Sequence, residues 1–497
     1  MPNQASFFFY DLETSGVKTD TSRIMQFAGQ RLDMDLEPVG EPLNLLIKLH
    51  EDVLPDPYAV LVHGIEPQTT LLEGLSEVEF MRAFYSEVVK PGTVFVGFNN
   101  VRFDDEFIRY INYRNLYDPY AWAYKDGCSR WDMLDVSRMF RALSPKHIIW
   151  PKDENGKNTN RLEMLASANK LSHELAHDAL SDVTATIELS RLLKKSDPEL
   201  FMQLFKLRAK DEVSKVINRN EPFFYTSSHY PSSLLHTTIA FKVGDNLTSK
   251  SAVLVYDLRH DPTPWLKMSS EQLADAWRYD PKRDFVKNPS LPLKTLRLNR
   301  CPAVLPLLEK YLIPAVFDRL DLDMDSIMSN LALLKNSQKE FAQNLNGALE
   351  ILNREQLARN RQQKRAVDAR LYDGASSLFY SDHDAKLLKE LHADNQESPA
   401  RVRALRARFS DPRLSQLSSF YLARNFKKEL TPTERKGWDD YLKRQLLGGG
   451  ESSALANYFK QIAQLKDERT EARAQVLLED LKLYGESLIP SDFVEQA

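Results

Sequence analysis

A pair of acidic residues follows a short apolar stretch near the N-terminus. Asp11 and Glu13 lie two positions apart at the end of residues 7–12, which have the composition of a strand. Strand residues two apart point to the same face, so both carboxylates should lie together. Two ionised carboxylates about 5 Å apart repel by roughly 3 kcal/mol at an effective dielectric of 20, and Mg²⁺ or Mn²⁺ between them removes that repulsion. The pair therefore indicates metal chemistry, although an isolated Asp-x-Glu more often marks a strand that ends in solvent.

A third acidic residue follows a second apolar stretch, at residues 93–98. Asp104 comes after Asn-Asn-Val-Arg-Phe and leads into a helical segment, so we expect it at a transition from strand to helix. From there its carboxylate could join the first two acids. The alternative is helix capping, a common function of Asp, and the next two residues, Asp105 and Glu106, also favour the positive end of a helix dipole.

A histidine and a fourth acidic residue lie five positions apart, at His177 and Asp182. On one continuous helix this spacing would place them about 140° apart, so we expect His177 in the loop just before the helix. A histidine titrates near neutrality and can accept the proton of a metal-bound water. A surface or capping histidine is the alternative for an isolated residue, and His173 is the competing candidate for the same role.

The elements that would hold these residues belong to an α/β pattern. Residues 1–195 alternate short apolar strand candidates with amphipathic helices, and a helix is expected from about residue 178 to 195. Residues 200–350 are interrupted by Pro and Ser and contain short strand candidates at 236–243, 252–258 and 295–298. From about residue 350 the pattern is helical. Three glycines at 448–450 separate two long helices, the second capped by Ser452 or Ser453.

Composition sets limits on the class of protein. The 497 residues are 42% hydrophobic, enough for several cores, and the longest apolar runs are too short to span a membrane. The N-terminus lacks the pattern of a secretory signal, so we expect a cytoplasmic protein with no membrane partner. Residues 1–200 carry 21 Lys and Arg against 31 Asp and Glu, and the remainder carries 45 against 39. An acidic, metal-collecting N-terminal region followed by more basic modules fits this difference, as does ordinary variation in surface composition.

Together and in this order, the three motifs resemble the DEDD exonuclease superfamily, in the subgroup whose general base is histidine. Each motif alone is weak, but their joint order within about 180 residues makes chance agreement improbable. Further segments resemble the bacterial exodeoxyribonuclease I family, so the resemblance covers nearly the whole chain. These segments are residues 99–106, 117–122, 130–132, 299–302, 371–374 and 423–426.

The resemblance implies a fold and an activity. The fold is a ribonuclease H-like α/β exonuclease domain at 1–195, an SH3-like β-barrel domain at 200–350 and an α-helical C-terminal domain at 355–497. The activity is hydrolysis of single-stranded DNA from the 3′ end toward the 5′ end by a two-metal-ion mechanism. This would release 5′-mononucleotides in DNA repair and recombination.

The resemblance also implies roles for individual residues. Asp11, Glu13, Asp104 and Asp182 would hold two Mg²⁺ ions, with Mn²⁺ as a substitute, and His177 would activate the attacking water. The expected partners are single-stranded DNA and the acidic, apolar tail of single-stranded-DNA-binding protein, and we expect a monomer. Ser144 stands where the family is expected to place a basic residue in the pocket for that tail, so this chain departs from the family pattern at that position.

Candidate substrate contacts come from an aromatic and basic stretch between residues 98 and 131. Stacking is worth about 1 to 3 kcal/mol per base and tolerates any sequence. We name Glu13, Arg102, Phe103 and Trp131 as substrate contacts, and we expect most of the other aromatic residues to be core. Two alternative functions remain: a 3′ exoribonuclease of the same superfamily, and a binding module that keeps the fold without hydrolysis.

Overall fold

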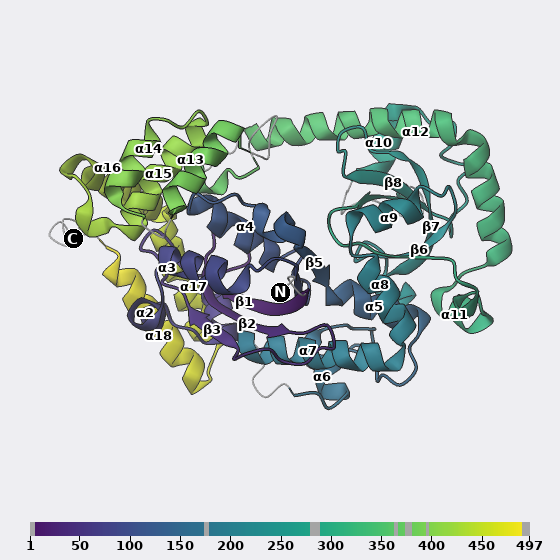
Figure 1. Cartoon of the computed structure of the whole chain (residues 1–497), viewed down its shortest axis with the longest axis horizontal. Coiled ribbons are helices and arrows are strands. Elements are labelled where there is room, and N and C mark those ends of the chain that lie inside the picture. The colour runs from purple at the N-terminus through teal and green to yellow at the C-terminus, as the bar shows by residue number, and fades with distance from the viewer. Residues whose placement is uncertain are drawn as a thin grey trace. The chain divides into compact units, whose positions relative to one another are not determined.

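The computed structural model describes residues 5–172, 178–278, 289–361, 366–372, 380–393 and 397–489 (Figure 1). The chain forms two compact units, each assembled from separate stretches of sequence. Unit 1 comprises Met1–Cys128, Glu174–Thr184 and Arg365–Ala497, and unit 2 comprises Ser129–His173 and Ala185–Lys364. The catalytic candidates on β1 (Ser6–Thr14), on α4 (Asp104–Arg114) and at the start of α7 (Ala179–Ser196) therefore share one unit.

Unit 1 is built on a sheet in which strands lie in the order β3-β2-β1-β4. The other strands are β2 (Ile24–Leu32), β3 (Leu43–Leu46) and β4 (Thr93–Gly97). β1 pairs antiparallel with β2 and parallel with β4, where Phe7 lies opposite Val94. The aromatic residues of β1 alternate between the two faces of the sheet and all are buried, as expected for a central strand of a sheet that is covered on both faces. The predicted strands at 7–12 and 93–98 are confirmed.

Local sequence signals set the limits of the helices around this sheet. Asp56 caps α1, Pro57 opens it, and Gly64 ends it in the left-handed conformation with φ 73°. Ser76 and Glu79 form a capping box at the start of α3. The elements are α1 (Pro57–His63), α2 (Pro67–Glu73), α3 (Glu77–Ala83), η1 (Phe84–Val88), η2 (Ala121–Ala123) and η3 (Lys125–Gly127).

The C-terminal part of unit 1 is helical, as predicted. One core joins α4 to these helices through Tyr110 and Tyr113, and another joins α1 to α17 and α18 through Val60. The Ser453 hydroxyl accepts a hydrogen bond from the Ala456 N–H at 3.2 Å, which confirms the predicted cap. The elements are η6 (Val367–Ala369), α13 (Asp382–His392), α14 (Pro399–Arg406), α15 (Pro412–Asn425), η8 (Lys427–Glu429), α16 (Pro432–Leu447), η9 (Gly450–Ser452), α17 (Ala454–Glu468) and α18 (Ala472–Ser487).

Unit 2 contains an antiparallel sheet with the strand order β10-β6-β7-β8-β9, which confirms the predicted β-rich texture. The long helix α12 (Met324–Arg361) packs against α10 and β7 and begins well before the predicted onset of helix at about residue 350 (Figure 1). The other elements are β5 (Ser129–Asp132), α5 (Met133–Leu143), α6 (Leu162–Ala168), α8 (Pro198–Lys206), α9 (Lys210–Ile217), β6 (Phe223–Thr226), η4 (Ser232–Leu234), β7 (Thr237–Asp245), β8 (Ala252–Asp257), α10 (Ser270–Trp277), β9 (Leu293–Arg297), β10 (Ala303–Pro306), η5 (Glu309–Tyr311) and α11 (Pro314–Leu320).

Every described helix is too short or too polar to cross a membrane.

Candidate metal centre

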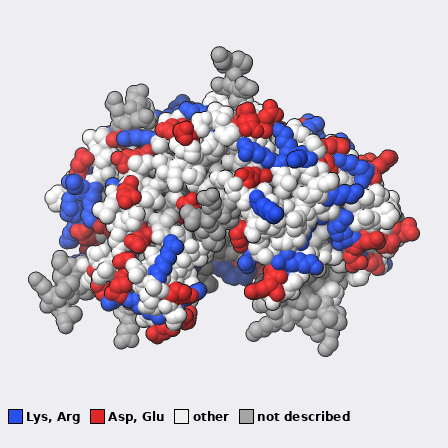
Figure 2. Space-filling model, turned by 90° about the horizontal axis from the view of Figure 1, so that it is seen from below, with Lys and Arg blue, Asp and Glu red and all other residues white. Residues whose placement is uncertain are grey.

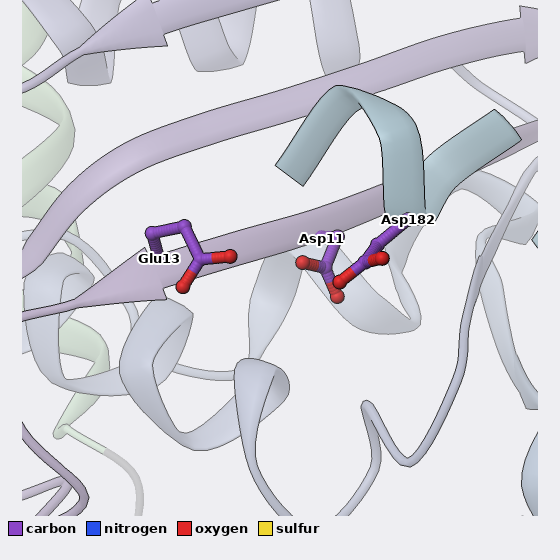
Figure 3. Close-up of side chains that lie close together, drawn as sticks. All are labelled: Asp11, Glu13 and Asp182. Atoms are coloured by element: carbon purple, nitrogen blue, oxygen red, sulfur yellow. The ribbon is translucent and has the colours of Figure 1, made fainter. Parts of the chain in front are cut away.

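Three of the predicted acids come together at the end of β1. The ligand atoms of Asp11, Glu13 and Asp182 all lie within 4.8 Å of one another. Asp11 and Glu13 rise from the same face of β1, and Asp182 reaches the strand from the first turns of α7 (Figure 3). The carboxylates of Asp11 and Asp182 point toward one another. This close grouping of oxygen ligands is the kind of site that Mg²⁺ or Mn²⁺ prefers.

The start of α7 is fixed to the sheet by a residue without a predicted role. The Asp178 carboxylate accepts a hydrogen bond from the Ser181 N–H at 3.2 Å, so it caps the helix that carries Asp182. It also accepts a hydrogen bond from the Gln26 side chain on β2 at 3.1 Å. Gln26 lies opposite Glu13 in the β1–β2 register. One pair of side chains therefore connects the helix of Asp182 to the strand beside Glu13.

Asp104 is the first residue of α4 and is buried at 4% exposure. It is not one of the three clustered acids, but its charge raises the pKa of Asp11, so it lies close to them. The N-cap of α4 is Phe103, and the capping alternative for Asp104 is not what the structure shows. The next acid, Asp105, has a structural role because it accepts hydrogen bonds from the Tyr10 hydroxyl and the Asn100 side chain.

The electrostatics of the cluster call for a cation. Burial, followed by the charges of Asp104, Asp182 and Asp178, raises the pKa of Asp11 well above its usual value. Burial and the charge of Asp11 raise the pKa of Glu13 to about 9. Four carboxylates in one partly buried site repel one another strongly, and a divalent cation provides the compensating charge. The residues present therefore fit a hard divalent metal ion.

Metal binding is expected to release protons. Because the pKa of Glu13 is about 9, the metal-free cluster holds at least one proton at pH 7. Carboxylates must be deprotonated to bind metal, so the affinity for Mg²⁺ should rise with pH, by up to about tenfold per pH unit for each proton released. Calorimetric titration in two buffers with different heats of ionisation measures this release. An identical binding heat in both buffers would contradict the prediction.

His177, predicted as the general base, and His173, its competitor, lie outside the described residues. Asp178 and Gln26 were missed by the sequence analysis. A signal for Asp178 existed, since an acid three residues before Ser181 at the start of a helix is typical of a cap. Gln26 had no such signal, because its partner lies 152 residues away.

The proposed substrate contacts differ in their exposure. Arg102 is exposed and Phe103 is partly exposed at the start of α4, where Phe103 packs against Phe107 at 5.0 Å between ring centroids. Trp131 in unit 2 is only 2% exposed and packs edge-on against the rings of Phe201 and Phe205. Its burial favours a core role, because almost none of its surface is accessible to a base.

Most of the neighbouring aromatic residues are core, as predicted, with exposures of 3% or less for Phe107, Tyr110, Tyr113 and Trp122. Two of the interleaved basic residues are also buried and paired: Arg114 with Glu77 and Arg109 with Glu106. On the face shown in Figure 2, basic and acidic side chains are interspersed, without a broad surface of one sign. Charge on that face alone does not mark the path of a nucleic acid.

Three family models match the chain. The model described as "Exonuclease" matches residues 8–190, the "Exonuclease I SH3-like domain" matches 208–350, and the "Exonuclease I C-terminal domain" matches 365–488. Exodeoxyribonuclease I of Haemophilus influenzae is 35% identical over 465 residues, which cover 90% of this chain and 92% of the relative. The Escherichia coli enzyme of the same name is 33% identical over 489 residues, which cover 98% of each chain.

Solved structures agree with these matches. An exonuclease I from Methylocaldum szegediense superposes with a TM-score of 0.87 at 35% identity, covering 98% of this chain and 100% of that one. E. coli exonuclease I in complex with a dA16 oligonucleotide superposes with a TM-score of 0.89 at 32% identity and the same coverage.

The α/β domain with its carboxylate cluster and the exonuclease match define the class of protein: a metal-dependent nuclease. The two additional domain matches narrow the class, because they cover most of the remaining chain. The chain belongs to the exonuclease I family. The predicted fold of an exonuclease domain, an SH3-like domain and a helical C-terminal domain is thereby confirmed, while the predicted domain boundaries stay a prediction.

Proposed function

We propose that this protein degrades single-stranded DNA from its 3′ end and releases 5′-mononucleotides, in DNA repair and recombination. The observation that supports it best is the cluster of Asp11, Glu13 and Asp182, with ligand atoms within 4.8 Å, in a chain of this family. The E. coli relative has been solved with a bound dA16 oligonucleotide. A monomer in the cytoplasm is part of the same proposal.

The mechanism follows from the charge and placement of these residues. Asp11, Glu13, Asp104 and Asp182 would hold two Mg²⁺ ions, with Mn²⁺ as a substitute. Bound in pairs, such ions lower the pKa of water and stabilise the entering and leaving oxygens of a phosphodiester displacement. The positions of these carboxylates are fixed because β1 and α4 share one hydrophobic core, and the hydrogen bond from Gln26 to Asp178 attaches the start of α7 to β2. His177 would accept the proton of the attacking water.

The direction and the substrate are tested with one set of oligonucleotides. A DNA strand labelled at its 5′ end, the same strand labelled at its 3′ end, an RNA strand and a blunt DNA duplex are incubated with Mg²⁺. We expect a ladder of shortening 5′-labelled products, immediate release of labelled mononucleotide from the 3′ label, and slow loss of duplex. Faster loss of RNA than of DNA would favour a 3′ exoribonuclease instead, and no hydrolysis of any strand would favour a binding module.

Replacing His177 by Ala tests the general base. We expect kcat on single-stranded DNA to fall by about 100-fold, because a positioned base typically contributes at least that much. Metal affinity should stay within twofold, since the histidine is not proposed as a ligand. Calorimetry with Mg²⁺ and a steady-state assay measure the two properties, and His173→Ala is the matched control. A larger loss for His173→Ala than for His177→Ala would reverse the assignment.

The second proposed partner is the C-terminal tail of single-stranded-DNA-binding protein. One of the structurally similar solved structures is of single-stranded-DNA-binding protein and exonuclease I in complex with an inhibitor. In this chain Ser144 ends α5, and its hydroxyl hydrogen-bonds to the Asp197 carboxyl, so this position supplies no positive charge. We expect a labelled tail peptide to bind more tightly to Ser144→Arg than to the wild type in a fluorescence anisotropy titration. Equal affinities would show that this position does not contribute.

A further inference from the structure

A cavity of about 630 Å³ lies beside the acidic cluster within unit 1. Helix α1 forms one wall of this cavity, and the turn between α17 and α18 with the start of α18 forms the opposite wall. Asp178 also lines the cavity, and its charge acts on Asp11 and Glu13 of the acidic cluster. We call it the α1–α18 pocket. Its lining residues are Tyr58, Leu61, Val62, His63, Asp178, Arg469, Glu471, Arg473, Ala474 and Leu477. Its volume is in the range of pockets that hold small ligands, which suits one or two nucleotides.

The walls of the α1–α18 pocket are held firmly together. Val60 of α1 is fully buried in a core with Leu465 of α17 and Leu478 of α18. The turn between the two C-terminal helices is fixed by Gln475, whose side chain donates hydrogen bonds to the carbonyl oxygens of Lys466 and Arg469. The pocket is therefore a preformed feature of the fold.

One arginine lies directly over the end of α1. A Cβ placed on Gly64 would lie 2.8 Å from the Arg473 Nη2 atom, so the guanidinium sits against the backbone where α1 ends. Gly64 also has φ 73°, a conformation that favours glycine. Glycine at this position thus allows the close approach of Arg473 to α1.

The α1–α18 pocket combines positive charge with apolar surface. Arg469 and Arg473 are both exposed, and neither makes an ion pair with any described residue. Tyr58 and Val62 are 45% and 56% exposed on the opposite wall. Two acids also line the pocket: Glu471 precedes the first turn of α18, and Asp178 is already hydrogen-bonded to Ser181 and Gln26. Guanidinium groups above an apolar wall suit a nucleotide strand, since arginine forks match phosphate oxygens and bases pack on apolar side chains.

We propose that Arg469 and Arg473 bind the sugar–phosphate backbone of the strand whose 3′ end lies at the catalytic acids. This inference rests on the proposed function, because it takes single-stranded DNA as the substrate. It gives the C-terminal helical region a direct part in the reaction, because Arg469 and Arg473, at the end of α17 and on α18, add positive charge beside the acidic end of β1. Both arginines are substrate-binding residues, distinct from the metal ligands.

The test compares binding and turnover in the full-length protein. Arg469→Ala, Arg473→Ala and the double variant are titrated with a fluorescein-labelled oligothymidine in Ca²⁺ buffer at several salt concentrations. Each single variant should bind about two- to fivefold more weakly, and the double variant about tenfold. The slope of log affinity against log salt should fall by about 0.7 for each phosphate that is no longer neutralised. In Mg²⁺, KM should rise by a similar factor while kcat stays within twofold.

Two control variants separate this effect from loss of folding. Arg473→Lys keeps the charge and should recover most of the affinity, and Lys482→Ala removes a cation from the same helix outside the pocket, where it pairs with Glu479 and Glu486. Tm is measured for every variant. The inference is overturned if the wild type degrades single-stranded DNA but the folded double variant shows the same affinity, salt slope and KM. If the wild type neither binds nor degrades single-stranded DNA, the proposed function itself fails.

Discussion

Replacing Asp11 by Asn is expected to lower kcat on single-stranded DNA by at least about 10³-fold. Asp11 lies between the other acids, within 4.8 Å of ligand atoms of Glu13 and Asp182. Removing a residue that hydrogen-bonds to a metal ligand typically lowers metal affinity or activity by roughly 10- to 100-fold. Removing a ligand itself should lower activity further. Asn keeps the size of the side chain but cannot supply the negative charge. A single-turnover assay with saturating Mg²⁺ measures the loss.

The same substitution should stabilise the metal-free protein at pH 7. Burial and three neighbouring acids raise the pKa of Asp11, so its ionised form is less favourable in the folded state than in the unfolded state. The stability associated with a raised carboxyl pKa is present at low pH and is lost as pH rises above the unfolded value. We therefore expect a higher Tm for Asp11→Asn than for the wild type in EDTA, with the difference growing from pH 5 to pH 8.

This pair of results separates a metal-binding role from a structural one. Asp440→Asn, on the exposed surface of α16, is the matched control and should change neither kcat nor Tm. A variant that lost activity together with Tm would show that Asp11 supports the fold instead. Full activity in a stable Asp11→Asn variant would remove Asp11 from the catalytic set.

Sequence patterns predicted the parts of the site that depend on local geometry. The spacing of Asp11 and Glu13 placed both on one face of a strand, because alternation along a strand is a property of the backbone. Asp104 was expected at a transition from strand to helix, and it opens α4. Asp182 was expected within the first turns of a helix, and it follows the start of α7 by three residues. Each prediction needed only neighbouring residues.

Contacts between distant segments could not be predicted in the same way. The bond from Gln26 to Asp178 depends on how β2 lies against α7, and no local pattern encodes that arrangement. The α1–α18 pocket also depends on the packing of α17 and α18 against a helix about 400 residues earlier in the chain. Hydrophobic pattern shows which helix faces are buried, but not which partner covers them.

A buried group of ion pairs shows the same limit. Arg424 donates hydrogen bonds to Asp52 at 2.6 Å and to Asp368 at 2.7 Å, and Arg23 donates to Asp368 at 2.9 Å. The side chains of all four residues are at most 4% exposed. The backbone of Arg23 is hydrogen-bonded to Ser15, in the loop that follows Glu13. These charges therefore connect α15 and η6 to the segment just after the metal centre.

Removing one member of this group should destabilise unit 1 strongly. Arg424→Gln would leave two buried carboxylates with Arg23 as their only remaining partner within the group. Removing one partner of a buried ion pair typically lowers the free energy of unfolding by about 3 to 5 kcal/mol, because the remaining buried charge is no longer compensated. We expect the hydrogen-exchange protection of amides in α15 to fall by roughly 10²- to 10³-fold at pH 7, since 1.4 kcal/mol corresponds to a factor of ten.

The dependence on pH distinguishes this effect from a loss of packing. In the wild type the arginines hold the pKa of Asp52 and of Asp368 below its usual value, so their contribution is present above about pH 4 and is lost as pH falls further. Without Arg424 the burial of these carboxyls should raise their pKa, so protonation stabilises the variant at low pH. The difference in stability between the wild type and Arg424→Gln should therefore become smaller from pH 7 to pH 4.

Arg424→Lys, which keeps the charge but not the planar fork of the guanidinium, should lose less stability than Arg424→Gln. If the difference in stability between the wild type and Arg424→Gln stays constant from pH 7 to pH 4, Arg424 acts through its contacts with the rings of Phe420 and Trp438 instead of through its charge.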